Sequence, residues 1–474
     1  NNGLFDINVL VGAEGGTAIT HSGTTTGPAH QQGDVDQSRI YMVAIPKNDA
    51  VTMLVSGQIG YDDAVSAQVD PDGAVVLSAG YNIVGGQIAG NPVGNAAANI
   101  TINDTIFRSD TTARASGDLL AQPLATVPVG GPVSVPPPPH LGRVVIEGNG
   151  LLVGDRSATF NIGAGQLGGT TGNLELRSTA GNASMVVSGG QFFAPFGNLS
   201  VVAGRTVLAD GSTQAGSASL VVAAGGQLLA DRISVNADAD GGVDAGGNGL
   251  TGRGGTARMT VTGSGSAIQS SQTSITAYGR GGSTTTGLSG GNGVGGTAEF
   301  IIDGDSSTSI LPGDVVVGAG ASGGSASGEN ARGGNAAGGT ARVTVTGGAL
   351  VEFNSLFADA GAQSGGAVSP SQTTALSGSA IGGIVTLAVD GGSELLVDGN
   401  AALDASADAV ISDNIGSSQG GTISATASGG GVIDILGILS ASADSRSGAA
   451  GTTRSSVGSA AGGQIALTAQ NGQL

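Results

Sequence analysis

The sequence predicts an all-β fold, a right-handed parallel β-helix with about three strands in each coil, and three observations support it. A Gly–Gly pair occurs six times at spacings of 41, 43, 44, 38 and 42 residues, beginning at Gly254, Gly295, Gly338, Gly382, Gly420 and Gly462. Each pair precedes seven residues that alternate between apolar and polar. No stretch longer than about two turns combines helical periodicity with capping residues. A period of this length is typical of solenoids.

The stretch after each glycine pair predicts the first strand of a coil. The third, fifth and seventh residues after the first glycine are apolar in all six copies, as in Ala257, Met259 and Val261. The residues between them are mostly Arg, Glu, Thr and Ser, as alternation about a buried face requires. A second strand follows a glycine turn, and a third strand supplies inward residues such as Ile275 and Val315. One coil cannot close a core, so the coils stack as parallel strands, with the right-handed crossover that such connections prefer.

The organisation of the chain follows from where this repeat begins. Residues 1–120 are β-rich but less regular, and we expect them to be β-helical as well. Residues 121–140 contain four consecutive prolines, which cannot donate to a sheet ladder, and form a linker or a long loop within a continuous helix. Residues 141–474 carry the repeat of about 42 residues. Because the chain begins with Asn1 rather than Met, we expect a portion of a larger precursor.

Most repeats carry an insertion after the third strand, rich in Gly, Ser, Thr and Asn. These insertions span 280–294, 321–337, 362–381 and 408–419. Each leaves the coil at the same vertex, and insertions at one vertex project from one side of a solenoid, often its binding face. Their low apolar content predicts flexible loops that do not pack by themselves.

Composition limits the classes of function. The net charge of −19 disfavours nucleic acid and anionic membranes as partners, because both are bound through Lys and Arg. There is no cysteine, so the chain has neither a disulfide framework nor a thiolate site. The hydrophobic content of 39% suffices for a core, which must be built from Val, Ile, Leu and Ala because aromatic residues are only 3%. No apolar run approaches the ~20 residues of a membrane-spanning helix.

The sequence predicts no catalytic and no cofactor-binding residues. The one candidate metal site is a Ca²⁺ site at Asp238, Asp240 and Asp244, in the glycine-rich stretch NADADGGVDAGGNG. Its spacing matches neither an EF-hand nor a nonapeptide repeat, and a solvated loop is the alternative. A row formed by Arg258, Glu299 and Arg342 is explained by charge pairing between neighbouring coils. A polysaccharide lyase or hydrolase, which would need paired carboxylates or an Arg–Asp cluster on one strand face, is the enzymatic alternative.

The repeats resemble the passenger region of filamentous haemagglutinin-like exoproteins, large secreted bacterial adhesins. The resemblance lies in stretches such as SLVVAAGGQLLADRISVNADA, residues 219–239, and in residues 39–80, RIYMVAIPKNDAVTMLVSGQIGYDDAVSAQVDPDGAVVLSAG. It implies export through an outer-membrane transporter by two-partner secretion, a long right-handed β-helix, and a role in attachment or cell–cell contact. The amino-terminal secretion domain of that family is missing here.

We therefore expect a non-catalytic, extracellular, structural and adhesive β-helical segment on a bacterial cell surface. Its partner would be a glycan or protein on a cell surface, or another copy joined end to end. A structural subunit of a self-assembled extracellular filament is the second possibility, and the polysaccharide-active enzyme is the third.

Overall fold

The computed structural model describes residues 173–474 apart from 286–287, 306–308, 370–374, 411–413 and 448–457. Before residue 173 it describes strands β1–β13, with side chains only at 157–160 and 162, and the side chains of 309–311 are not described. Every regular element in the described part is a strand, and nearly all pairings between strands are parallel. The predicted parallel β-helix is thereby confirmed, whereas its right-handedness stays a prediction.

The chain forms two compact units. The first comprises Asn1–Val202, Val221–Ile233 and Ala267–Ser270, and the second comprises Ala203–Leu220, Ser234–Ser266 and Ser271–Leu474. Strands β19 (Ser217–Ala223) and β20 (Gln227–Asn236) have residues in both units. The first unit includes residues on both sides of the proline-rich stretch.

The first unit contains three parallel ladders. One joins β1 (Asp6–Ala13), β4 (Arg39–Pro46), β6 (Ala74–Ala79), β8 (Thr111–Ala115), β11 (Asn149–Gly154), β14 (Asn173–Ser178) and the end of β16 (Gln191–Val202). The next joins β2 (Thr17–His21), β5 (Val51–Tyr61), β7 (Ala97–Phe107), β9 (Asp118–Pro123), β12 (Ser157–Ile162) and β15 (Ala183–Ser188). The last joins β3 (Thr24–Gly27), the ends of β5 and β7, β10 (Arg143–Ile146), β13 (Gln166–Leu167) and the start of β16.

These ladders bear on the proline-rich stretch. Residues 124–142 lie outside the described part of the chain, but strands on either side of them pair directly. Val144 is in register with Thr105, and Leu152 is in register with Ala113. The strands before and after this stretch therefore belong to the same ladders. In the same unit, β24 (Ala267–Gln269) pairs with β20.

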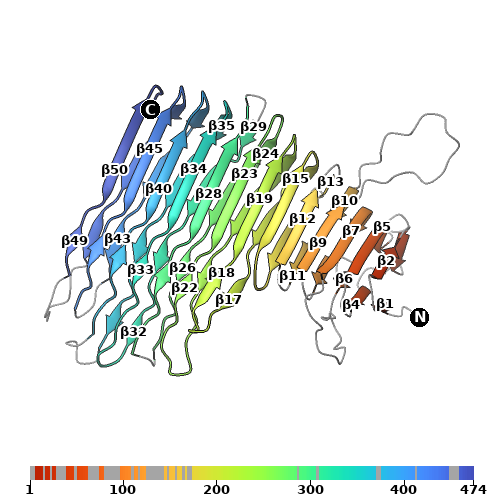
Figure 1. Cartoon of the computed structure of the whole chain (residues 1–474), viewed down its shortest axis with the longest axis horizontal. Helices are drawn as coiled ribbons and strands as arrows, with labels where there is room; N and C mark the ends of the chain where they lie inside the picture. The colour runs from red at the N-terminus through yellow and green to blue at the C-terminus, as the bar shows by residue number, and fades with distance from the viewer. Residues whose placement is uncertain are drawn as a thin grey trace, which may run out of the picture. The chain divides into compact units, whose positions relative to one another are not determined.

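The second unit has a body of long strands (Figure 1). The first strands of its coils are β23 (Thr256–Thr262), β28 (Thr297–Asp303), β34 (Thr340–Thr346), β40 (Ile384–Val389), β45 (Thr422–Ser428) and β50 (Gln464–Gln470). The second are β29 (Ser309–Leu311), β35 (Leu350–Phe353), β41 (Glu394–Val397) and β46 (Val432–Ile435). The third are β25 (Gln272–Thr276), β30 (Asp314–Gly318), β36 (Ser355–Asp359), β42 (Ala401–Asp404) and β47 (Leu439–Ser442).

The predicted inward rows form the core of this body. The three apolar positions of the first strand are at most 1% exposed in the five copies from β23 to β45. Large side chains stack along the coils, and the rings of Phe300 and Phe353 lie parallel with centroids 5.9 Å apart. In the last copy, Ile465 and Leu467 are about half exposed, because in the described structure β50 has a first-strand neighbour on one side only.

The insertions differ from the prediction. Each insertion continues the coil as one short outgoing strand and one short returning strand. Equivalent strands of neighbouring coils pair in parallel, so that the insertions form two narrow sheets below the body in Figure 1. We call this part the fin. Its outgoing strands are β21 (Ala239–Asp240), β26 (Gly279–Arg280), β31 (Ala321–Ser322), β37 (Ala362–Gln363), β43 (Ala407–Ala409) and β48 (Ser445–Ser447). Its returning strands are β18 (Thr213–Ala215), β22 (Gly252–Arg253), β27 (Gly293–Val294), β33 (Ala336–Ala337), β39 (Ala380–Ile381), β44 (Ser418–Gln419) and β49 (Ala460–Ala461).

The fin explains how segments without large apolar residues pack. Ala321, Ala336, Ala362, Ala380 and Ala407 form a buried cluster between its two layers. Farther out, glycines bring the layers into backbone contact, and hydrogen bonds such as Gly291 N–H to Gly282 O (2.8 Å) and Gly324 N–H to Gly291 O (2.8 Å) link them across successive coils. The fin also includes β17 (Arg205–Val207), antiparallel to β18, and the pair β32 (Ala326–Ser327) and β38 (Ala367–Val368). The prediction of loops that cannot pack is therefore wrong for the described parts of the insertions.

Candidate functional site: two grooves at the waist

The body and the fin meet at a waist, which each coil crosses twice. On the return path the crossing is made by the repeated glycine pair, and on the outward path by an alanine that follows the third strand. The second glycine of each pair donates its N–H across the waist to that alanine's carbonyl in the preceding coil. This bond is 2.7 Å from Gly255 to Ala237 and 2.7 Å from Gly296 to Ala277, and it continues to Gly463 and Ala443 at 2.8 Å.

Both glycines of a pair are required by space. A Cβ at Gly254 would lie 2.1 Å from the carbonyl oxygen of Ala277, and a Cβ at Gly255 would lie 1.9 Å from that of Gly216. Real Cβ atoms do not approach backbone this closely, so neither position accepts a side chain without displacement of the backbone. The period that predicts the fold from sequence therefore marks the narrowest point of each coil.

The peptide between the two glycines of each pair does not bond to the equivalent peptide of the next coil, because its N–H points across the waist. All peptide bonds in the described structure are trans, so the N–H and C=O of one peptide point in opposite directions. Since the N–H of Gly255 points inward across the waist, the carbonyl of Gly254 points outward. The same holds for Gly295, Gly338 and Gly382, and none of these four carbonyls accepts a hydrogen bond from the described residues.

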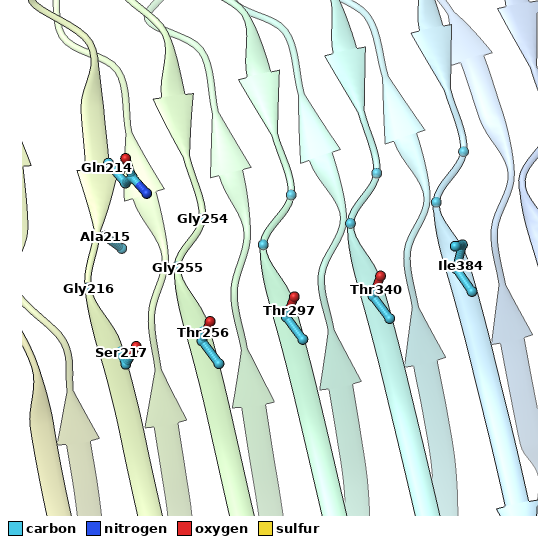
Figure 2. A pocket seen from close by; sticks show the side chains of 16 residues that line it. Gln214, Ala215, Gly216, Ser217, Gly254, Gly255, Thr256, Thr297, Thr340 and Ile384 are labelled. Carbon is cyan, nitrogen blue, oxygen red and sulfur yellow. The ribbon is translucent and has the colours of Figure 1, made fainter. Parts of the chain in front are cut away.

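These carbonyls lie in a groove of about 750 Å³, which we call the carbonyl groove. Figure 2 shows that glycine pairs, such as Gly254 and Gly255, form the floor of this groove in neighbouring coils. Beside them, Thr256, Thr297 and Thr340 occupy the same position on neighbouring strands and direct their side chains to the same side (Figure 2). None of the residues that line the groove has an ionisable side chain.

The opposite side of the waist is also a groove, of about 330 Å³, which we call the amide groove. Here the carbonyl of each waist alanine points inward, so the N–H of the residue that follows the alanine points outward into the groove. The chain's own side chains accept most of these N–H groups: Asp359 Oδ1 accepts from Gly361 (2.7 Å), Asp404 Oδ1 from Ser406 (2.8 Å) and Asp238 Oδ1 from Tyr278 (2.7 Å). The acidic side chains of this groove therefore cap exposed amides.

Tyr278 and Asp359 are the most perturbed groups of the amide groove. The Tyr278 side chain lies over Gly318, where a Cβ would be 2.1 Å from its hydroxyl oxygen, and its hydroxyl donates to the Asp359 carboxylate. Burial, and then the charge of Asp404, raise the pKa of Asp359. Burial and the charge of Asp359 raise the pKa of Tyr278, so this phenol stays protonated at neutral pH. The guanidinium carbon of Arg280 lies 5.4 Å from the centre of the tyrosine ring.

Each of the three aspartates of the candidate Ca²⁺ site has partners within the chain, and Asp238 and Asp240 share one of them, Arg280. Asp238 is buried and bound to the Tyr278 amide and to Asn236 Nδ2 (2.9 Å). Asp240 forms ion pairs with Arg205 (2.9 Å) and Arg280 (3.2 Å). Asp244 accepts the Asn248 N–H (2.7 Å) within its own turn, which lowers its pKa. Within the described ranges, no three His, Cys, Asp or Glu side chains are arranged to hold a metal ion.

The predicted charge pairing between coils is confirmed. Arg258 Nε donates to Glu299 Oε2 at 2.7 Å, a second bond comes from its Nη2, and Arg342 Nη1 lies 3.6 Å from Glu299 Oε1. Glu299 is only 6% exposed, so a buried carboxylate is held between two half-exposed guanidinium groups on the neighbouring strands. A polysaccharide-active enzyme would need such groups to converge on an open cleft. The charged groups of this row are instead paired with one another.

The grooves and their residues were not found from sequence. The sequence places Gly254 and its equivalents before the first strand of each coil, but it does not show that the fin folds back within hydrogen-bond distance of the body. Three coils cap the outward amide alike, because Asn236, Asp359 and Asp404 each accept from the N–H two residues later, with an alanine between. The Tyr278 amide differs, since its acceptor is Asp238 of the preceding coil. The sequence signal for the amide groove is the Asx–Ala pair at the end of the third strand, which occurs in three coils. The glycine pair alone is no signal for the waist, because turn pairs such as Gly347–Gly348 have positive φ at both residues.

Comparison with known proteins gives no relative. No protein-family model, curated protein or solved structure matches the chain. Among the described residues, a helix with the length and hydropathy of a membrane span is not found.

Proposed function

We propose that this chain is a structural and adhesive β-helical segment of an extracellular bacterial surface protein, without catalytic activity. The observation that carries the proposal is the carbonyl groove, in which at least four successive coils present the same pattern of outward carbonyls and side-chain positions. Such a surface offers many equivalent weak contacts instead of one catalytic centre, and linked weak contacts produce strong attachment.

The stacking of the coils supports the mechanical half of the proposal. Each coil is joined to the next by parallel ladders in the body and in the fin, and the waist bonds tie body to fin between successive coils. These bonds resist separation of one coil from the next and of the body from the fin. The resemblance to filamentous haemagglutinin-like adhesins supports the same function, together with export through an outer-membrane transporter.

A bead assay tests attachment. The folded chain is coupled to beads, and binding is counted on the cells that produce it and on surfaces coated with their extracellular matrix. The matched control is the same chain coupled after denaturation. We expect retention only by the folded chain. Equal retention of both preparations, or release of cleaved products from a panel of polysaccharides, would contradict the proposal, and end-to-end filaments in electron micrographs of the free chain would favour a filament subunit instead.

A further inference from the structure

We propose that the carbonyl groove binds a neutral polysaccharide chain lying across the coils, with about one sugar unit per coil. This inference rests on the proposed adhesive function and names the chemistry of its partner. It starts from a difference between the two sides of the waist. Across each waist bond, the peptide of the glycine pair exposes its C=O on one side, and the peptide that follows the alanine exposes its N–H on the other.

The chain caps one side and leaves the other open. In the amide groove, side-chain carboxylates and amides of the chain accept from the outward N–H groups of Asp238, Tyr278, Gly361 and Ser406. In the carbonyl groove, the side chains beside the glycine carbonyls are those of Thr256, Thr297, Thr340 and Ile384, none of which has an amide or a charged donor. The carbonyls of Gly254, Gly295, Gly338 and Gly382 thus accept nothing from the described residues and face the groove.

The open acceptors define which ligands fit. A partner must supply donors at intervals of one coil, ~4.8 Å, which is the spacing of neighbouring strands and close to the length of a sugar unit in an extended glycan. Sugar hydroxyls donate to carbonyls and also accept from threonine hydroxyls, so they match both rows. They would replace water molecules that solvate the carbonyls in the free protein.

Other ligand classes match less well. An extended peptide alternates N–H and C=O along its edge, so its carbonyls would face the carbonyl row. An anionic polymer finds no cationic side chain in the groove, and a polycation finds no carboxylate, so a charged polymer forms no ion pair there. Ca²⁺ takes about six to eight oxygen ligands, whereas consecutive carbonyls lie a coil apart and no carboxylate is beside them. The neutral hydroxylated chain is what remains.

Binding should then depend on ligand length. Each coil contributes one carbonyl, and three of the four coils add a threonine hydroxyl, so a short oligosaccharide makes few contacts and a longer one makes more, until the coils of the groove are filled. Because no aromatic side chain lines the groove, affinity comes from the number of contacts and not from a single stacking site.

The test is a binding series with cello-, malto- and N-acetylated chito-oligosaccharides from disaccharide to hexasaccharide, measured by titration calorimetry on the full chain. Three proteins are compared: wild type, Thr297→Tyr/Thr340→Tyr, and Thr260→Tyr/Thr344→Tyr. The first double variant fills the groove without touching the glycines. The second places the same side chains on the same class of strands, four residues farther along and outside the groove.

We expect at least one series to bind with affinity that rises with chain length, a loss of about tenfold or more in the groove variant, and no change in the matched control. Unchanged circular dichroism in both variants shows that the fold persists. Failure of all three series to bind, equal effects of the two variants, or tighter binding of heparin or of an extended peptide would overturn the inference. If the beads still attach, the adhesive function survives that failure and only the glycan assignment falls.

Discussion

At the scale of the residue, the glycine pairs show that one residue type can repeat for two different reasons. Turn glycines such as Gly347 and Gly391 adopt positive φ, which disfavours a side chain. The waist glycines need no unusual φ, yet backbone oxygens occupy the place of their Cβ atoms. The first kind can be inferred from its position between two strands, whereas the second depends on a contact with another coil.

Gly296→Ala should therefore destabilise the fold. Its Cβ would lie 2.0 Å from the Gly255 carbonyl oxygen, so the backbone must move and weaken the 2.7 Å bond to Ala277. We expect a loss of roughly 1–3 kcal/mol in unfolding free energy, as for overpacked sites, measured by urea denaturation followed by circular dichroism. Gly242→Ala is the matched control, because nothing lies within 4 Å of its Cβ position. Equal stability of the two variants would show that the waist is looser than the structure indicates.

Asp359 makes stability depend on pH with an unusual sign. Burial and the nearby charge of Asp404 raise its pKa in the folded state above the unfolded value of 3.8, so the folded state holds the proton more tightly. Ionisation then costs stability above the folded pKa, and this cost disappears as pH falls below the unfolded pKa. Asp359→Asn retains an acceptor for the Gly361 amide and should be more stable than wild type at pH 7.

The pH series separates this effect from a general change in packing. The stability gain of Asp359→Asn should shrink between pH 7 and pH 3, followed by urea midpoints. Asp244→Asn is the comparison, because hydrogen bonds from Asn248 lower the pKa of Asp244, and its substitution should remove stability at pH 7 and lose that effect in acid. A gain of Asp359→Asn that is constant across the pH range would argue against a raised pKa.

At the scale of the element, the strands of the body were predictable and those of the fin were not. A strand with one buried face alternates in sequence, and the buried rows from Ala257 to Ala427 carry that alternation in every coil. The fin buries backbone and methyl groups, so a segment such as 321–337 has the composition of a flexible loop. Composition shows what a segment lacks in apolar side chains, but not how closely two glycine strands can approach.

At the scale of the whole second unit, the coil is the structural unit. The first strands of successive coils are in register, from Thr256 through Thr297 and Thr340 to Ile384. The fin strands follow the same register through Ala321, Ala362 and Ala407. The sequence period predicted this stacking, because like residues return to like positions. It could not predict the two-part cross-section, since the depth of the fin depends on contacts between insertions.

Removal of one complete coil should therefore leave a folded protein. Deletion of residues 340–383 places β40 directly after β28 in the stack, and keeps the Arg258–Glu299 pair. Deletion of residues 297–339 removes Glu299 and places Arg258 opposite Arg342. Both proteins should retain the circular dichroism of a parallel β-helix, but the second should be less stable by about 1 kcal/mol, because like charges then face each other across the ladder.

Salt distinguishes this charge effect from a difference in packing. The two deletion proteins should approach each other in stability as ionic strength rises from 0.05 to 1 M, since screening weakens the contact between half-exposed guanidinium groups. A deletion of residues 340–361 is the control: it removes the three body strands β34, β35 and β36 and leaves the fin strands β37 and β39, so body and fin lose their common register and the product should aggregate. A coil that carries its own body, waist and fin contacts can be removed without unfolding the others. Aggregation of the two complete deletions would therefore contradict the prediction, and would show that stability depends on the stack as a whole and not on the single coil.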